Sequence, residues 1–172
     1  MQELIFLRIL HLVNVLHLNK IARPRGSTYS FADYFKGLEN VEAVRQIFGE
    51  KTEMVLKNLK VEFTWFGYMF VDSEDGHIVI NSRYLQNGDK VDIYLDLIHE
   101  LVHVRQFMEG KQLFDSHYGY ADRPTEVEAY RYAVQEARKI GLSDERICLY
   151  LKTEWMSEED LKRLAKHVNV KC

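Results

Sequence analysis

The spacing of apolar and polar residues predicts helices in the first and last parts of the chain. The run Leu4–Leu18 is apolar, but four polar or charged side chains interrupt it, so it is too short and too broken for a membrane span. We expect a helix that is buried over much of its surface; a helix that docks on a partner or a membrane is the alternative. From Ser30 to Lys60 the pattern is helical in two or three pieces, with breaks at Gly37 and Gly49.

The middle of the chain has the composition of β-strands. Aromatic and β-branched residues dominate Val61–Val71, which predicts a strand. The segment Asp72–Gly76 has turn chemistry and His77–Asn81 is typical of a return strand, so we expect a β-hairpin. Trp65 and Trp155 are expected to anchor the core or a smaller cluster beside it.

The second half returns to helical periodicity. Asp89 is the expected N-cap of a helix that runs to about Glu109, and Pro124 is well suited to open the next helix, which continues to Gly141. Two further helices follow, with serine N-caps at positions 143 and 157. Because helices flank a single hairpin and no βαβ alternation occurs, the expected fold class is α+β, with a small antiparallel sheet packed on helices.

Length and composition indicate one globular domain. The chain has 172 residues, of which 47% are hydrophobic and 28% charged, and these values exclude disordered and low-complexity classes. We expect one domain over 1–172, made of a helical part (1–60), a core (61–141) and C-terminal helices (142–172). The net charge of −3 provides no basic field, so no nucleic-acid partner is expected. The oligomeric state is left open.

Two cysteines are too few for a disulfide framework or a four-cysteine zinc site. Cys148 lies between apolar neighbours and is expected in the core, while Cys172 is the last residue of the sequence. We expect reduced thiols in a cytoplasmic protein, because no targeting signal is recognisable at the start of the sequence.

The strongest chemical motif is an HExxH sequence, formed by residues 99–103. Residues four apart share one face of a helix, so His99 and His103 could bind one metal ion. Glu100 lies about 100° round the helix, where a general base can reach a metal-bound water. The surrounding helix is apolar, and burial of these groups would be costly without a partner such as a metal. Two hydrogen-bonded core histidines and an exposed glutamate are the competing interpretation.

A zinc site of this kind needs a third protein ligand, and the helix opened by Pro124 offers Glu126 and Glu128. These two residues lie about 200° apart on a helix, so only one can face the metal. Ala133 and Ala137 lie within about 20° of the Glu126 direction, and a face of small residues allows close helix approach. The pattern therefore favours Glu126, with Glu128 as the alternative, and one Zn²⁺ per chain.

The segments 99–106 and 124–129 resemble the gluzincin clan of zinc metallopeptidases, and the Glu-x-Glu-Ala run resembles its small M48-like and IrrE-like members. The resemblance implies a zincin-like fold with the HExxH helix central and extra helices at both ends. It also implies a small sheet beside that helix whose edge strand binds extended substrate, a role expected for His77–Asn81. The implied roles are zinc ligation by His99, His103 and Glu126 and general-base catalysis by Glu100.

The resemblance has departures and leaves some roles open. Gluzincins usually carry an acidic residue or asparagine four positions after the ligand glutamate, where this chain has Tyr130. Asp96 shares the histidine face and could replace the missing acceptor. An oxyanion needs a donor besides zinc, and the loop before the second helix supplies the candidates His117, Tyr118, Tyr120 and Arg123.

The sequence therefore predicts a zinc-dependent metallopeptidase that acts on a peptide or protein substrate through a zinc-activated water, with Glu100 as its base. The alternative is a zinc-binding regulatory or interaction protein of the same fold without peptidase activity. A helical interaction protein with a chance motif is the third interpretation.

Overall fold

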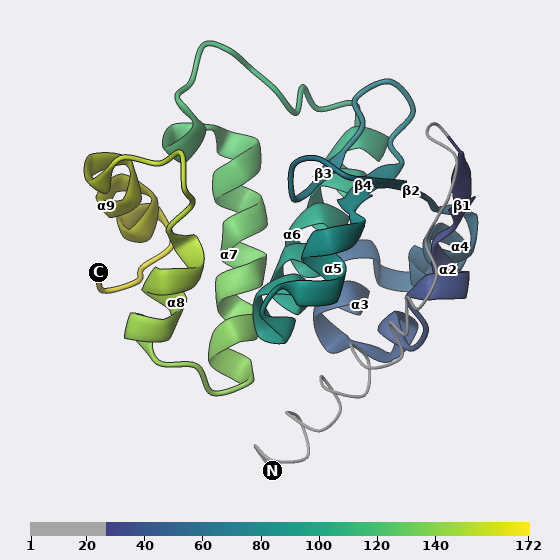
Figure 1. Ribbon diagram of the computed structural model, residues 1–172, viewed down its shortest axis with the longest axis horizontal. Helices are drawn as coiled ribbons and strands as arrows, with labels where there is room; N and C mark the ends of the chain where they lie inside the picture. Colours follow the sequence, from purple (N-terminus) through teal and green to yellow (C-terminus); the bar gives the residue numbers. More distant parts are fainter. Residues whose placement is uncertain (1–26) are drawn as a thin grey trace.

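The computed structural model describes residues 27–172. The helix expected over 4–18 lies outside these residues. Figure 1 shows the long helix α6 (Lys90–Met108) in the middle of the molecule, between the strands and α7 (Pro124–Lys139). The helices α8 (Asp144–Leu151) and α9 (Glu158–His167) lie beyond α7, so the α+β class is confirmed.

The segment before the sheet is helical in short pieces, as predicted. Gly37 and Gly49 both have positive φ, at 89° and 58°, and they mark the breaks between the pieces. The elements are β1 (Thr28–Ser30), α2 (Phe31–Tyr34), η1 (Leu38–Asn40), α3 (Glu42–Phe48), η2 (Gly49–Lys51) and α4 (Thr52–Asn58).

The sheet is mixed, with strand order β1-β2-β4-β3, so the prediction of an antiparallel sheet is wrong. The strands after β1 are β2 (Lys60–Thr64), β3 (Met69–Val71) and β4 (Ile78–Asn81). β4 pairs antiparallel with β3, which confirms a hairpin, and parallel with β2. β4 is therefore an interior strand, and β3, rather than the expected His77–Asn81, forms the edge.

The run expected as one strand divides at residues 65–68. The Asn81 side chain donates hydrogen bonds to the carbonyls of Trp65 and Gly67, at 3.4 and 2.7 Å, and Gly67 has a φ of 69°. This turn carries the chain across β4, so β2 and β3 pair with opposite edges of that strand. Trp65 is 49% exposed and Trp155 59% exposed, so neither lies in the core. Trp155 packs instead in a smaller aromatic cluster, with ring centroids 5.7 Å from Tyr68 and 6.3 Å from Tyr120.

The central helix α6 begins where the sequence predicts. The Asp89 carboxylate accepts hydrogen bonds from the backbone N–H groups of Val91 and Asp92, which makes it the N-cap. Gly110, with a φ of 73°, follows the end of the helix. Helix α5 (Ser82–Asn87) leads into α6 from β4. α6 is buried along most of its length, which places its chemistry at the centre of the fold.

Helix α7 packs along α6 through small side chains. Ala129, Ala133 and Ala137 are each 0% exposed, and Pro124 is the first residue of the helix, as predicted. Ser143 and Ser157 cap α8 and α9, and these two predictions are also confirmed. No helix in the part of the chain that the structure describes is long and apolar enough to span a membrane.

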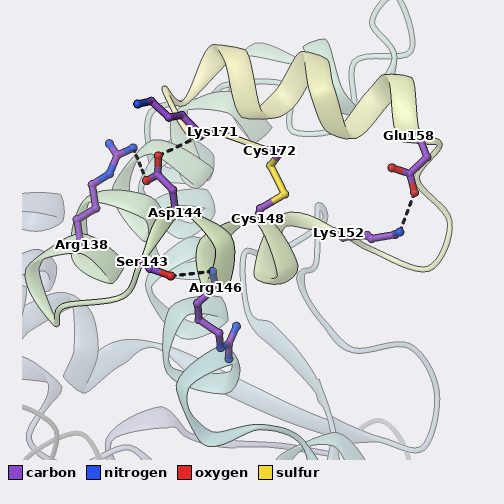
Figure 2. The surroundings of a disulfide bond; sticks show 9 residues. All are labelled: Arg138, Ser143, Asp144, Arg146, Cys148, Lys152, Glu158, Lys171 and Cys172. Carbon is purple, nitrogen blue, oxygen red and sulfur yellow. Dashed lines mark hydrogen bonds and ion pairs between the residues drawn. A yellow bond between two sulfur atoms is a disulfide. The ribbon is translucent and has the colours of Figure 1, made fainter.

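Cys148 and Cys172 form a disulfide, so the expectation of reduced thiols is wrong (Figure 2). The bond ties the end of the chain to α8, and the backbone N–H of Lys171 donates to Asp144 nearby. Disulfides are rare in the reducing cytoplasm, so the cytoplasmic location stays a prediction.

Replacement of Cys172 by serine is expected to lower the free energy of unfolding by about 3 kcal/mol, because the disulfide closes a loop with a sequence separation of 24 residues. Denaturant unfolding under non-reducing conditions measures this loss. A variant as stable as the oxidised parent would show that the disulfide does not constrain the unfolded chain.

Candidate metal centre

Three potential ligand atoms converge between α6 and α7. The Nε2 atoms of His99 and His103 lie 2.9 Å apart, and Glu126 Oε2 lies 3.2 Å from the first and 3.5 Å from the second. All three residues are buried, with exposures of 6%, 6% and 5%. The structure therefore forms a buried His-His-Glu group that could hold a metal ion.

The spacing of these atoms fits a small divalent cation. Ligands about 2.0–2.1 Å from a tetrahedral zinc ion lie about 3.3 Å from each other. The three distances between the ligand atoms, 2.9, 3.2 and 3.5 Å, lie on either side of this value. In addition, Glu126 Oε2 is buried without a well-aligned hydrogen bond, which is costly for a carboxylate unless a cation joins it.

The ionisation of the group reflects its burial and mutual contacts. Burial lowers the pKa of His99. Burial would also lower the pKa of His103, but Glu126 and Glu100 raise it to about 9. Burial would raise the pKa of Glu126, but contacts with His103 and His99 hold it well below its usual range. Without metal, the group is therefore expected to carry one proton, held on His103, at neutral pH.

Zinc binding at pH 7 is expected to release at least one proton, because His103 must lose its proton to bind the metal while His99 and Glu126 are already deprotonated. The apparent affinity should then rise about tenfold per pH unit and level off near pH 9. Calorimetric titration in buffers of different ionisation enthalpy counts the protons. Release of none at pH 7 would contradict this ionisation state.

Glu100 lies beside the group without joining it. It is 6% exposed, so the exposed glutamate of the competing interpretation is wrong. Burial raises the pKa of its carboxyl to about 8, although His103 and the backbone of Val71 partly offset the rise. Its Oε2 has no hydrogen-bond partner. The side chain lines two cavities, so this oxygen is near space that a substrate could occupy.

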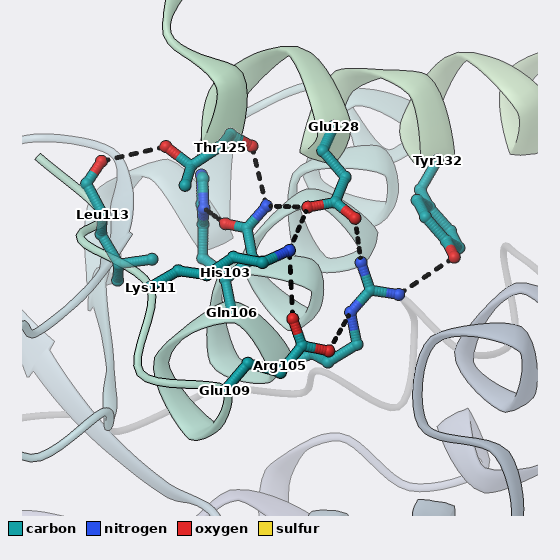
Figure 3. A network of polar contacts seen from close by, with 9 residues as sticks. All are labelled: His103, Arg105, Gln106, Glu109, Lys111, Leu113, Thr125, Glu128 and Tyr132. Carbon is teal, nitrogen blue, oxygen red and sulfur yellow. Dashed lines mark hydrogen bonds and ion pairs between the residues drawn. The ribbon is translucent and has the colours of Figure 1, made fainter. Parts of the chain in front are cut away.

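The structure separates the two candidate third ligands. Glu128 points away from the histidines toward the end of α6, where it accepts hydrogen bonds from Arg105 at 2.7 Å and Lys111 at 3.0 Å (Figure 3). Glu126 alone of the pair reaches the histidines. Glu128 is instead part of an ion-pair network with Arg105 and Lys111.

Gln106 orients His103, a role that the sequence analysis missed. Its Oε1 lies 2.7 Å from His103 Nδ1, and its Nε2 donates to the Thr125 carbonyl and to Glu128 (Figure 3). The side chain is 0% exposed. Its position, three residues after His103 on the same helix face, was the signal available in the sequence.

Asp96 does not take the role expected for it. It accepts a hydrogen bond from the Tyr84 hydroxyl at 2.5 Å, whereas His99 Nδ1 has no hydrogen-bond partner. Desolvation raises the pKa of Asp96 to about 6. The ring of Tyr130 packs edge-on against His99, with centroids 4.4 Å apart, and its hydroxyl lies 2.9 Å from that of Tyr120.

The four oxyanion candidates lie in different surroundings. Tyr120 lines both cavities beside Glu100. Arg123 lies near the ligand group, with Nη1 3.7 Å from Glu126 Oε1. The side chain of His117 is 88% exposed and pairs with Asp115, and Tyr118 is 46% exposed. Of the four, the structure brings Tyr120 and Arg123 to the site and leaves the other two on the surface.

Two cavities of about 310 and 190 Å³ border the site. His99, Glu100 and Tyr120 line both, as do Met69 and Trp155. A second group of possible ligands, Asp72, Asp75 and His77, lies in the turn between β3 and β4. Asp72 and Asp75 accept hydrogen bonds from the turn backbone there, so the turn itself accounts for their positions.

The centre thus combines three convergent ligand atoms, an adjacent buried carboxylate and two bordering cavities. Comparisons of the chain with protein-family models, with curated proteins and with solved structures found no match.

Proposed function

We propose that the chain is a zinc-dependent metallopeptidase of zincin-like fold, with zinc held by His99, His103 and Glu126 and Glu100 as general base. The observation that carries the proposal is the convergence of three buried ligand atoms beside a buried carboxylate with a free oxygen. Three protein ligands leave a fourth position for water or substrate, which is the arrangement of catalytic zinc sites.

In this reaction a bound zinc ion would lower the pKa of water to about 7 and polarise the peptide carbonyl. Glu100 would accept the proton from the attacking water and pass it to the leaving amine. Its buried setting favours this task, because a carboxyl with a raised pKa holds a proton more readily at neutral pH. Tyr120 would donate a hydrogen bond to the developing oxyanion from the cavity wall.

The strand β3 would hold the substrate backbone. It is the edge of the sheet and contacts α6, and Met69 and Val71 border the smaller cavity with Glu100. An extended peptide could pair with such an edge through main-chain hydrogen bonds. This assignment moves the expected substrate strand from His77–Asn81 to Met69–Val71.

The proposed peptidase is tested by incubating the zinc-loaded chain with a diverse peptide mixture and identifying cleavage products by mass spectrometry. We expect cleavage that a chelator abolishes and that added zinc restores. If the chain binds zinc but cleaves none of the peptides, the peptidase proposal fails. The zinc-binding regulatory protein would then be the better account.

A further inference from the structure

The larger cavity combines aromatic walls with carboxylates. Its rings include Tyr68, Tyr84 and Trp155, and the Tyr68 centroid lies 5.2 Å from that of Tyr84 and 5.7 Å from that of Trp155. Asp96 and Glu154 line the same space. Aromatic faces and carboxylates both attract cations, and a cation within about 6 Å of a ring centroid is stabilised by the ring.

Among residues 27–172, the cationic side chains with ion pairs close to this cavity bind other carboxylates. Arg146 pairs with Asp92 at 2.6 Å, and Lys152, which also lines the cavity, pairs with Glu158 at 2.7 Å. Within residues 27–172, neither Asp96 nor Glu154 forms an ion pair with a lysine or arginine. The cavity therefore has negative charge to offer a ligand.

A buried hydroxyl at the same place also lacks a well-formed bond. Tyr150 is 9% exposed and lines the cavity, and its hydroxyl lies beside Asp96 without an aligned hydrogen bond. A buried hydroxyl whose contact with Asp96 is poorly aligned would gain from a ligand that bonds to it. A donor-rich cationic group between Asp96 and Tyr150 would supply hydrogen bonds to both oxygens.

The smaller cavity, which Glu100 also lines, has different chemistry. Apart from the groups of the metal centre, its lining is mostly apolar and includes Phe70, Val71, Leu113 and Phe114. The two spaces that border Glu100 thus differ in the side chains that they would accept.

We propose that the larger cavity binds a cationic group of a peptide, either a lysine or arginine side chain or an N-terminal amine, while the smaller cavity accepts an apolar side chain. This inference names the substrate class of the proposed peptidase and rests on that function. Substrates would carry the basic group and the apolar residue on opposite sides of the cleaved bond.

The test is peptide binding to the full chain. The protein used is the double variant Glu100→Gln, Trp65→Phe. The first change suppresses turnover, and the second leaves Trp155, which lines the cavity, as the only tryptophan whose fluorescence reports binding. Matched peptides differ at one position, lysine against norleucine, which has the same stem without the ammonium. Each is used with a free and with an acetylated N-terminus.

We expect the lysine peptide to bind about tenfold or more tightly than the norleucine peptide, as for a hydrogen-bonded charged group. Added Asp96→Asn and Glu154→Gln substitutions should remove the preference. The control Glu159→Gln removes one negative charge from the exposed surface of α9 and should leave the preference for lysine unchanged. A preference for lysine that survives acetylation assigns the cavity to the side chain, whereas weaker binding of both peptides after acetylation assigns it to the N-terminal amine.

Binding that changes neither between lysine and norleucine nor on acetylation, or a preference unchanged by the Asp96 and Glu154 substitutions, would overturn the inference. Because binding is measured without turnover, the two proposals can fail separately. Selective binding without cleavage by the Glu100 parent would overturn only the peptidase. Cleavage without selectivity for the basic group would overturn only the cation subsite.

Discussion

The Glu100→Gln variant is expected to cleave peptides with a kcat/KM lower by about 10²- to 10⁴-fold, while its zinc content stays at about one ion per chain. Glutamine preserves the size of the side chain but cannot accept the proton from the attacking water. Steady-state kinetics and metal analysis on the same preparation measure both quantities.

The matched control is Glu159→Gln, which makes the same chemical change on the exposed face of α9 and should leave kcat/KM unaltered. A Glu100→Gln variant as active as the parent would exclude this residue as the base. Loss of zinc together with activity would instead show that Glu100 holds the metal centre together.

The second large effect concerns the third ligand. Glu126→Gln is expected to weaken zinc binding by more than about 100-fold, because it removes a carboxylate in contact with both histidines. Glu128→Gln should weaken it by about tenfold, because that carboxylate acts through its hydrogen bond with Gln106.

Competition titration with a chromophoric zinc chelator measures both dissociation constants. The two residues lie two positions apart on one helix, so the pair controls for helix stability and net charge. The reverse order of effects would mean that Glu128 turns inward when metal binds.

The parts of the site that sequence reasoning located depend on local helical geometry. His99 and His103 meet because residues four apart share a helix face. The choice of Glu126 over Glu128 followed from the alanine face of the helix. In the fold Ala133 and Ala137 are fully buried and α7 packs against α6, so Glu126, on the same face, lies close to the histidines. Such regularities hold inside one helix and can be read from spacing.

The features that were missed or wrong depend on contacts between distant segments. The division of the 61–71 run follows from hydrogen bonds that Asn81 donates to the turn before β3. The Cys148–Cys172 disulfide needs α8 and the chain end to meet, which spacing does not specify. Asp96 lies on the same face of the helix as His99, but its carboxylate accepts a hydrogen bond from Tyr84 of a neighbouring helix and not from His99.

The central claim is that His99, His103 and Glu126 hold a metal ion. The most direct measurement is the metal content of the purified full chain beside the variants His103→Ala and His117→Ala, the latter removing an exposed histidine. We predict about one zinc ion per chain in the parent and in His117→Ala and none in His103→Ala. Absence of metal from the parent, even after zinc is added and the excess removed, would contradict the account.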